Sequence, residues 1–165
     1  MKINKIREIN WICKNMNEKT FHIVKLLVAN ARLSFNALAK RVDLSPPAVA
    51  ERVRRLENTG VLLGYHAKLE RSAVGLPVTA FVRLRCKGAK FQAVRRLAIE
   101  LPQVLECHHI TGEACFLIKL AAPSILALEG LIERFRGYGQ ADSSVVLSSV
   151  VEQKPVFGVQ EGEWE

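Results

Sequence analysis

Guanidinium and amide groups gather on one side of a predicted helix between Ser45 and Gly60. At about 100° per residue, Val49, Val53 and Leu56 form one narrow apolar stripe. The opposite side carries Glu51, Arg54, Arg55 and Asn58, with Ala48 beside them and Arg52 at the flank. Arginine forks and side-chain amides form paired hydrogen bonds with guanine, adenine and phosphate. The spacing therefore predicts a helix that packs through one face and contacts DNA through the other.

Residues with well-defined capping roles mark the ends of this helix. Ser45 can accept a hydrogen bond from a free backbone N–H at the start, and Pro46 suits the first helical position. Gly60 suits the left-handed conformation that ends many helices. We expect DNA contacts from the first turn onward, at Ser45, Pro47, Ala48, Glu51, Arg52, Arg54, Arg55 and Asn58.

Two further amphipathic segments precede this helix. Residues 35–42 follow Ser34, a good capping residue, and their packing face carries Phe35, Leu38, Ala39 and Val42. Residues 21–28 are apolar on most sides, so we expect a mostly buried helix whose solvent face holds His22, Lys25 and Ala29. Three short helices, with a tight turn before the last, predict a winged-type helix-turn-helix that places its final helix in the major groove.

The charge of the chain is divided unevenly between its halves. Residues 1–76 hold 14 Lys and Arg against 6 Asp and Glu, a net charge of +8, whereas residues 77–165 hold 10 against 10. Amphipathic helices occur in any helical bundle, but this asymmetry suits a polyanionic partner for the N-terminal half only. Double-stranded DNA is therefore the expected partner of that half.

Composition excludes several classes of protein. With 165 residues, of which 49% are hydrophobic, the chain can form two small domains with real cores. No apolar run approaches the roughly 18 residues of a membrane helix, and the basic start lacks the apolar core of a secretory signal. The four cysteines form no C-x-x-C pair, which favours a cytoplasmic chain with reduced thiols. We expect no membrane partner, cofactor or catalytic residue.

The pattern changes in the C-terminal half. Alternating and helical runs predict the order strand, helix, strand, strand, helix, strand at residues 78–86, 91–101, 104–111, 115–121, 124–136 and 143–153. This order is that of a ferredoxin-like βαββαβ domain, with both helices on one face of an antiparallel sheet. The chain as a whole is therefore predicted to be α+β.

The sheet face without helices predicts an interface. In the first strand this face carries Phe81 between Thr79 and Arg83, and a lone domain would leave apolar area in water. Two such sheets paired across a two-fold axis bury it, and a dimer also presents two recognition helices to successive major grooves. We therefore expect a homodimer with Phe81 in its interface.

Thiol and imidazole groups near the second and third strands leave an alternative open. Cys107 and His109 share one strand face, so with Cys115 they could converge across two strands as a metal site or thiol switch. No closed C-x-x-C or H-x-x-H spacing supports zinc, and ordinary sheet packing explains the same residues. No metal ligand is therefore assigned.

With these motifs in view, residues 16 to about 155 resemble the leucine-responsive and asparagine-responsive (Lrp/AsnC) regulators. The resembling stretches are IVKLL at 23–27, RLS at 32–34, LAKRVDLSPPAVAERVRRLENTGVLLGY at 38–65, VGLP at 74–77, AFV at 80–82, PQVLECHHITGEACFLIKL at 102–120 and SSVVLSSVVEQK at 143–154. The resemblance implies an N-terminal extension at 1–15, a helix-turn-helix domain at 16–60, a connecting strand and linker at 61–77, an ACT-like ligand-sensing and oligomerisation (RAM) domain at 78–154 and a tail at 155–165.

The resemblance implies a transcriptional regulator whose DNA binding responds to a small-molecule effector, an amino acid, and whose dimers can assemble into tetramers or octamers. It places the effector site at the turn formed by Thr111, Gly112, Glu113, Ala114 and Cys115. This turn usually reads G-D-x-D in the family, so Glu113 keeps one carboxylate and Cys115 replaces the other. Near the start of the first helix, Asn17 and Thr20 stand where the family has carboxylates.

Two other functions remain as alternatives. Sirohaem decarboxylase subunits are similar to this family throughout, but they usually carry a His-x-Tyr-type motif where this chain has Cys107, His108 and His109. Their DNA-facing helix also tends to lack the arginine-rich face found here. A regulatory partner that no longer binds DNA is the second alternative, and Arg54 and Arg55 argue against it.

Overall fold

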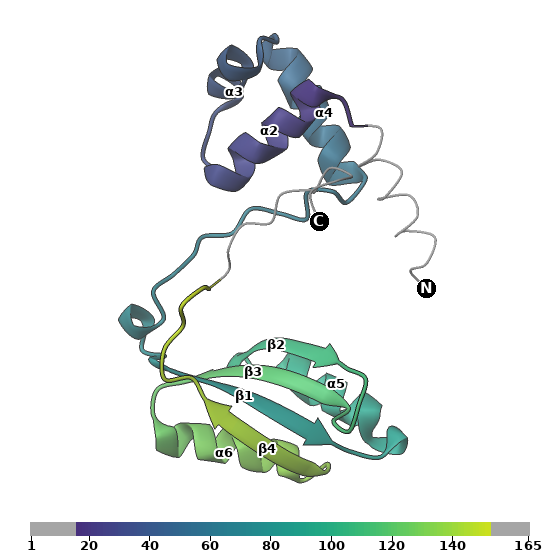
Figure 1. Ribbon diagram of the computed structural model, residues 1–165, viewed down its shortest axis with the longest axis vertical. Helices are drawn as coiled ribbons and strands as arrows, with labels where there is room; N and C mark the ends of the chain where they lie inside the picture. The colour runs from purple at the N-terminus through teal and green to yellow at the C-terminus, as the bar shows by residue number, and fades with distance from the viewer. Residues whose placement is uncertain (1–15, 153–165) are drawn as a thin grey trace, which may run out of the picture. The chain divides into compact units, whose positions relative to one another are not determined.

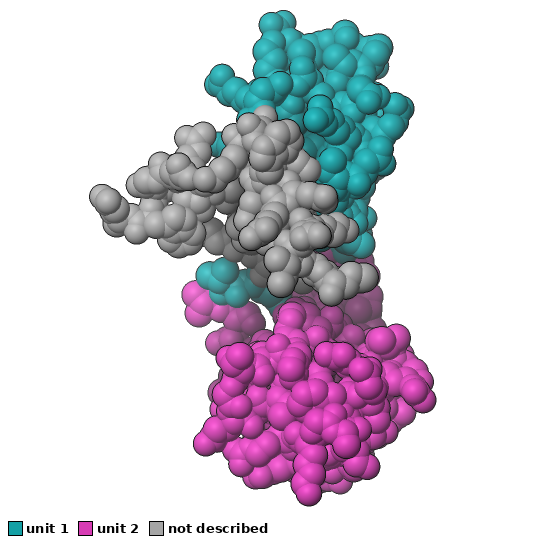
Figure 2. Space-filling view, turned by 90° about the vertical axis from the view of Figure 1, so that its right-hand side faces the viewer, with its two compact units in different colours: residues 1–67, 151–165 teal, residues 68–150 magenta. Residues whose placement is uncertain are grey.

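The computed structural model describes residues 16–152. Figure 2 colours the two compact units of the chain separately, and each is considered by itself. Within residues 16–67 the chain forms α2 (Glu18–Ala29), α3 (Phe35–Val42) and α4 (Pro46–Asn58) (Figure 1). A side-chain oxygen caps the N-terminus of each helix, and the capping residues are Asn17, Ser34 and Ser45. The predicted helix-turn-helix architecture is confirmed.

The core of the helical unit comes from all three helices. Its buried residues are Ile23, Leu27, Leu38, Ala39, Val42, Val49 and Val53. Between α3 and α4, Asp43 adopts a left-handed conformation with φ of 51°, so the turn is tight. Phe35 does not join the packing face as expected and is 45% exposed. It is the first residue of α3 and is not among the residues that pack in the core of the helical unit.

Residues 68–150 form an antiparallel sheet of β1 (Val78–Arg85), β2 (Val104–His109), β3 (Phe116–Ala122) and β4 (Gln140–Val145), in the order β2-β3-β1-β4. Helices α5 (Phe91–Glu100) and α6 (Ile125–Arg136) cover one face of it (Figure 1). Short 3-10 turns η1 (Ser72–Val74) and η2 (Gly88–Lys90) flank β1. This is the predicted ferredoxin-like topology.

Alternation along β1 sets which side chains meet the helices. Ala80, Val82 and Leu84 are fully buried against residues of α5 and α6, as predicted. Phe81 lies on the opposite face, where it is half-buried and opposes Lys119 of β3 and Ser144 of β4. A bulge in β2 between Val104 and Glu106 adjusts the register of this edge strand.

The last strand differs from the prediction of residues 143–153. It spans Gln140–Val145 and pairs with β1 from Arg85, opposite Gln140, to Ala80, opposite Val145. One more hydrogen bond follows, from Val146 N to Thr79 O at 2.8 Å. Residues 147–152 are not in a strand, and residue 153 lies outside the described residues.

The segment between α4 and β1 also differs from its prediction. Residues 61–77 contain no strand in the structure, and their only regular element is η1. Tyr65 instead ties the start of this segment to α4, because its hydroxyl donates to Glu57 Oε1 at 2.9 Å. None of the helices formed by residues 16–152 is long and apolar enough to cross a membrane.

Candidate nucleic-acid interface and effector turn

The sequence of α4 divides the helix into a packed stripe and an open face. Val49, Val53 and Leu56 are at most 3% exposed. The N-terminus is fixed by Ser45, whose Oγ accepts from the Ala48 N–H at 3.4 Å. Among the predicted DNA-contacting residues, the exposed ones are Ser45, Pro47, Glu51, Arg54, Arg55 and Asn58, while Ala48 is half-buried.

Two arginines of the open face stand in different environments. Arg54 Nη1 lies 2.7 Å from Glu51 Oε2 in an exposed ion pair, which is weak in water and easily exchanged for another anion. Arg55 makes no side-chain hydrogen bond or ion pair within residues 16–152 and lies in the last turn of the helix. Both guanidinium groups are therefore available to an external anion.

Arg52, another of the predicted DNA contacts, does not lie with this pair. Its side chain turns toward the start of α2, where Nη1 donates to Thr20 Oγ1 at 2.9 Å and to Asn17 Oδ1 at 3.2 Å. The same Asn17 oxygen accepts from the Thr20 N–H and so caps α2. Arg52 therefore fixes the position of α4 against α2 rather than reaching out from the surface.

The predicted effector turn joins β2 to β3. The Ile110 N–H donates to Cys115 O at 3.0 Å and closes the loop, while Gly112 adopts φ of 104°, a conformation that favours glycine. A Cβ added at Gly112 would meet nothing within 4 Å, so the space above this backbone is open. Thr111 and Glu113 are exposed, and Ala114 is half-buried.

The side chains of Glu113 and Cys115, which stand at the two positions that are usually acidic in the family, both have partners within the chain. Glu113 Oε2 lies 2.7 Å from Arg85 Nη2, so this carboxylate already has a cationic partner. Cys115 turns inward, because its thiol donates to Cys86 O at 3.1 Å and its side chain packs against the sheet core. The expected contact between the Cys115 side chain and an effector is therefore not available in this conformation.

The alternative arrangement, in which Cys107, His109 and Cys115 converge, is not observed. Cys115 contacts Cys86, whereas the His109 ring packs against Phe91 and Phe116 at centroid distances of 5.0 and 5.3 Å. Within residues 16–152, no group of three His, Cys, Asp or Glu residues could hold a metal ion. Sequence reasoning missed Cys86 as the neighbour of Cys115 because the two residues lie 29 positions apart in the chain.

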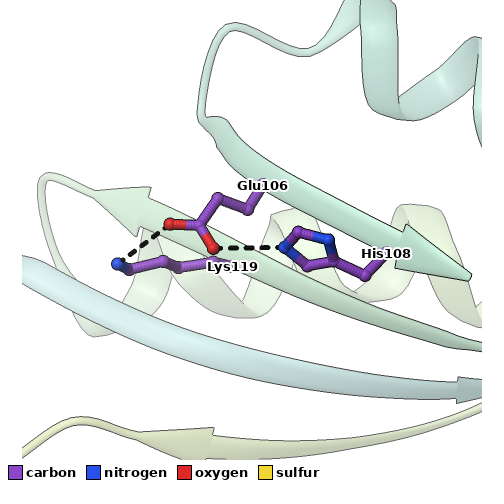
Figure 3. Close-up of polar contacts among 3 residues, drawn as sticks. All are labelled: Glu106, His108 and Lys119. Atoms are coloured by element: carbon purple, nitrogen blue, oxygen red, sulfur yellow. Dashed lines mark hydrogen bonds and ion pairs between the residues drawn. The ribbon is translucent and has the colours of Figure 1, made fainter. Parts of the chain in front are cut away.

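A polar cluster that alternation alone did not reveal lies on the helix-free face of the sheet. The Glu106 carboxylate lies between His108 and Lys119, with Oε2 3.2 Å from His108 Nε2 and Oε1 3.2 Å from Lys119 Nζ (Figure 3). These hydrogen bonds, that of His108 first, lower the pKa of Glu106 despite its partial burial. Lys119 Nζ also lies 5.8 Å from the centroid of the Phe81 ring.

Comparison with known proteins gives matches to both halves of the chain. The family model described as Lrp/AsnC ligand binding domain matches residues 79–156, and that described as winged helix-turn-helix DNA-binding matches residues 16–62. The HTH-type transcriptional regulator LrpC of Bacillus subtilis is 32% identical over 82% of this chain and 94% of its own length.

Solved structures agree with these matches. The structure of B. subtilis LrpC superimposes with a TM-score of 0.79 at 31% identity, over 85% of this chain and 99% of that one. A feast or famine regulatory protein from M. tuberculosis, complexed with L-methionine, gives a TM-score of 0.78 at 30% identity, over 87% of this chain and 99% of that one.

Proposed function

Because this chain belongs to the Lrp/AsnC family of DNA-binding transcriptional regulators, we propose that α4 carries its operator contacts and that an amino acid bound at residues 111–115 modulates them. The observation that carries the first part is the open face of α4, on which Arg54 and Arg55 are exposed opposite a buried stripe. The relatives named above are transcriptional regulators, which favours a regulatory role over an enzymatic one.

Base reading is assigned to Arg54, Arg55 and Asn58, with Ser45, Pro47 and Ala48 approaching the backbone of the DNA at the helix start. The exposed Glu51 competes with phosphate for Arg54, so it moderates the positive charge of this face. Arg52 supports the interface indirectly through Asn17 and Thr20. Arginine is suited to this role because its planar fork bonds guanine or phosphate in a bidentate manner.

The second unit supplies the sensor and the oligomer. We assign dimerisation to the helix-free sheet face around Phe81 and Lys119. The dimers are proposed to assemble further into tetramers or octamers. Two α4 helices in one dimer can then enter successive major grooves. A neutral amino acid is the proposed effector, since the M. tuberculosis relative is complexed with L-methionine. Its ammonium would take the place of Arg85 at the Glu113 carboxylate.

The experiment that tests the DNA contact is a gel shift on the upstream region of the gene itself. The Arg54→Ala and Arg55→Ala variants should each weaken binding by about 1–3 kcal/mol if the residue contacts a base, or flatten the salt dependence if it contacts phosphate. Arg134→Ala, on an exposed surface of α6, is the matched control and should bind normally. Unchanged affinity and salt slope in the Arg54→Ala/Arg55→Ala double variant would contradict the assignment.

Calorimetric titration with the twenty amino acids tests the effector site. Wild type should bind at least one neutral amino acid, and Gly112→Trp should abolish that binding by filling the open space at the turn. Tryptophan is also strained at the positive φ of this position, so circular dichroism must show that the sheet unit still folds. Tight binding that persists in the folded Gly112→Trp protein would place the site elsewhere.

A further inference from the structure

Two cysteines that flank the ends of different strands meet at the base of the proposed effector turn. Cys86 directly follows β1 and Cys115 directly precedes β3, and the last paired residues of these two strands at this end are Leu84 and Phe116. Cys115 is held by two hydrogen bonds to this part of the chain, from its N–H to Leu84 O at 2.8 Å and from its thiol to Cys86 O at 3.1 Å. Both side chains are half-buried against the sheet core.

The two thiols are close enough to affect each other. Burial raises the pKa of the Cys86 thiol, and the Cys115 thiol adds to this effect through its hydrogen bond and charge. A disulfide needs Cβ atoms about 3.5–4.5 Å apart. The Cys115 sulfur already lies 3.1 Å from the backbone oxygen of Cys86. Cys107 is set apart from this pair, because it lies on β2 opposite Ile118.

We propose that Cys86 and Cys115 form a reversible intramolecular disulfide when the protein meets a two-electron thiol oxidant such as hydrogen peroxide. One thiolate attacks a peroxide oxygen, the O–O bond breaks and the sulfenic acid forms with release of hydroxide, which takes up the thiol proton as water. The second thiol then attacks the sulfenic sulfur, so that the S–S bond forms and a second water leaves. Two thiols lose two electrons, and one peroxide gains them.

The location gives this modification a consequence. The disulfide would tie the end of β1 to the start of β3, where the Arg85–Glu113 ion pair already bridges the same two segments. The turn would then be held at Cys115, its C-terminal residue, by a covalent bond instead of by hydrogen bonds. Any effect of this bond on effector binding rests on the proposed function, whereas the formation of the disulfide does not.

The test uses the full chain carrying Cys13→Ser, so that the three cysteines of the described region are the only thiols. After treatment with hydrogen peroxide, the protein is digested without reduction and its peptides are analysed by mass spectrometry. We expect one linkage, between the peptides that contain Cys86 and Cys115, which dithiothreitol reverses. We also expect formation to be faster as the pH rises, because the thiolate is the reactive form.

Single variants make the result specific. Cys107→Ser, a half-buried cysteine outside the pair, should leave the linkage unchanged, whereas Cys86→Ser and Cys115→Ser should each abolish it. Cys86→Ala and Cys115→Ala repeat the test if the hydroxyl destabilises the core. A linkage through Cys107, or oxidation of single cysteines to sulfinic acid without any linkage, would overturn the proposal. If the linkage forms in a protein that binds no DNA, the disulfide proposal stands and the proposed function is refuted.

Discussion

The Arg85 guanidinium and the Glu113 carboxylate lie 2.7 Å apart, and their ion pair joins the end of β1 to the predicted effector turn. Both side chains are largely exposed, so the pair contributes little to stability. It matters for binding, since an amino acid whose ammonium is recognised by Glu113 must first displace Arg85. Arg85 is thus expected to weaken the binding of the effector to the turn.

Replacing Arg85 with alanine should therefore tighten amino-acid binding while leaving the melting temperature nearly unchanged. Calorimetric titration of wild type and Arg85→Ala with the same amino acids measures the first effect. Arg96→Ala is the control, because Arg96 is an exposed arginine on α5, away from the helix-free face of the sheet. An affinity that is unchanged or weaker in Arg85→Ala would show that the ammonium does not use Glu113.

Arg52 should matter for stability rather than for direct reading of DNA. Arg52→Ala removes two charge-assisted hydrogen bonds to Thr20 and Asn17, and we expect a loss of about 1.5–3 kcal/mol in the unfolding free energy of the helical unit. Arg54→Ala breaks only an exposed ion pair with Glu51, three positions earlier in the same helix. It should lower the free energy of unfolding by less than about 0.5 kcal/mol. Denaturant unfolding followed by circular dichroism compares the two, and equal losses would contradict the assigned role of Arg52.

Two glycines of the sheet unit should respond to alanine with opposite signs. A Cβ at Gly139 would lie 2.1 Å from Arg85 O and 2.9 Å from Cys86 Cβ, so the backbone must shift and we expect a loss of about 1–3 kcal/mol. At Gly130, inside α6, a Cβ would meet nothing within 4 Å, and alanine should stabilise the helix by about 0.5–1 kcal/mol. Thermal melts of both variants check this, and a neutral Gly139→Ala would refute the close approach.

Acid should weaken the sheet unit partly through Glu106. The folded pKa of this carboxyl lies below its ordinary value of 4.5, so its contribution to stability is present above that value and is lost as the pH falls through the folded pKa. Glu106→Gln lacks this contribution and should show a flatter fall in unfolding free energy between neutral and acidic pH than wild type. Glu129→Gln, at an exposed position on α6, should keep the wild-type slope, and identical slopes for all three proteins would contradict the prediction.

Phe81 tests the proposed dimer. Phe81→Asp would bury a carboxylate in the interface, and we expect monomers or aggregates that no longer bind DNA as wild type does. Thr79 shares this sheet face but is already buried within one chain, so Thr79→Ser is a conservative control that should keep the oligomer. Size-exclusion chromatography with light scattering measures both, and a full-size oligomer of Phe81→Asp would show that another surface forms the interface.

The sequence alone determined the elements whose signals are local. The α4 helix could be predicted because Ser45, Pro46 and the apolar stripe all lie within one segment and agree with each other. The ferredoxin-like order followed in the same way, since alternation along β1 and helical spacing in α5 and α6 are each visible within about ten residues. The asymmetric charge likewise identified the DNA-binding half without any knowledge of packing.

Only the tertiary structure decided which side chains from distant segments meet. Arg52 reaches Thr20 across 32 positions, and Cys115 reaches Cys86 across 29, so no local spacing could reveal either contact. The bounds of β4 likewise became visible only in its pairing with β1, because the polar run at the start of the strand has no apolar alternation to read. A strand or an exposed charge acquires its partner from the fold around it, and that information is absent from the residues on either side of it in the chain.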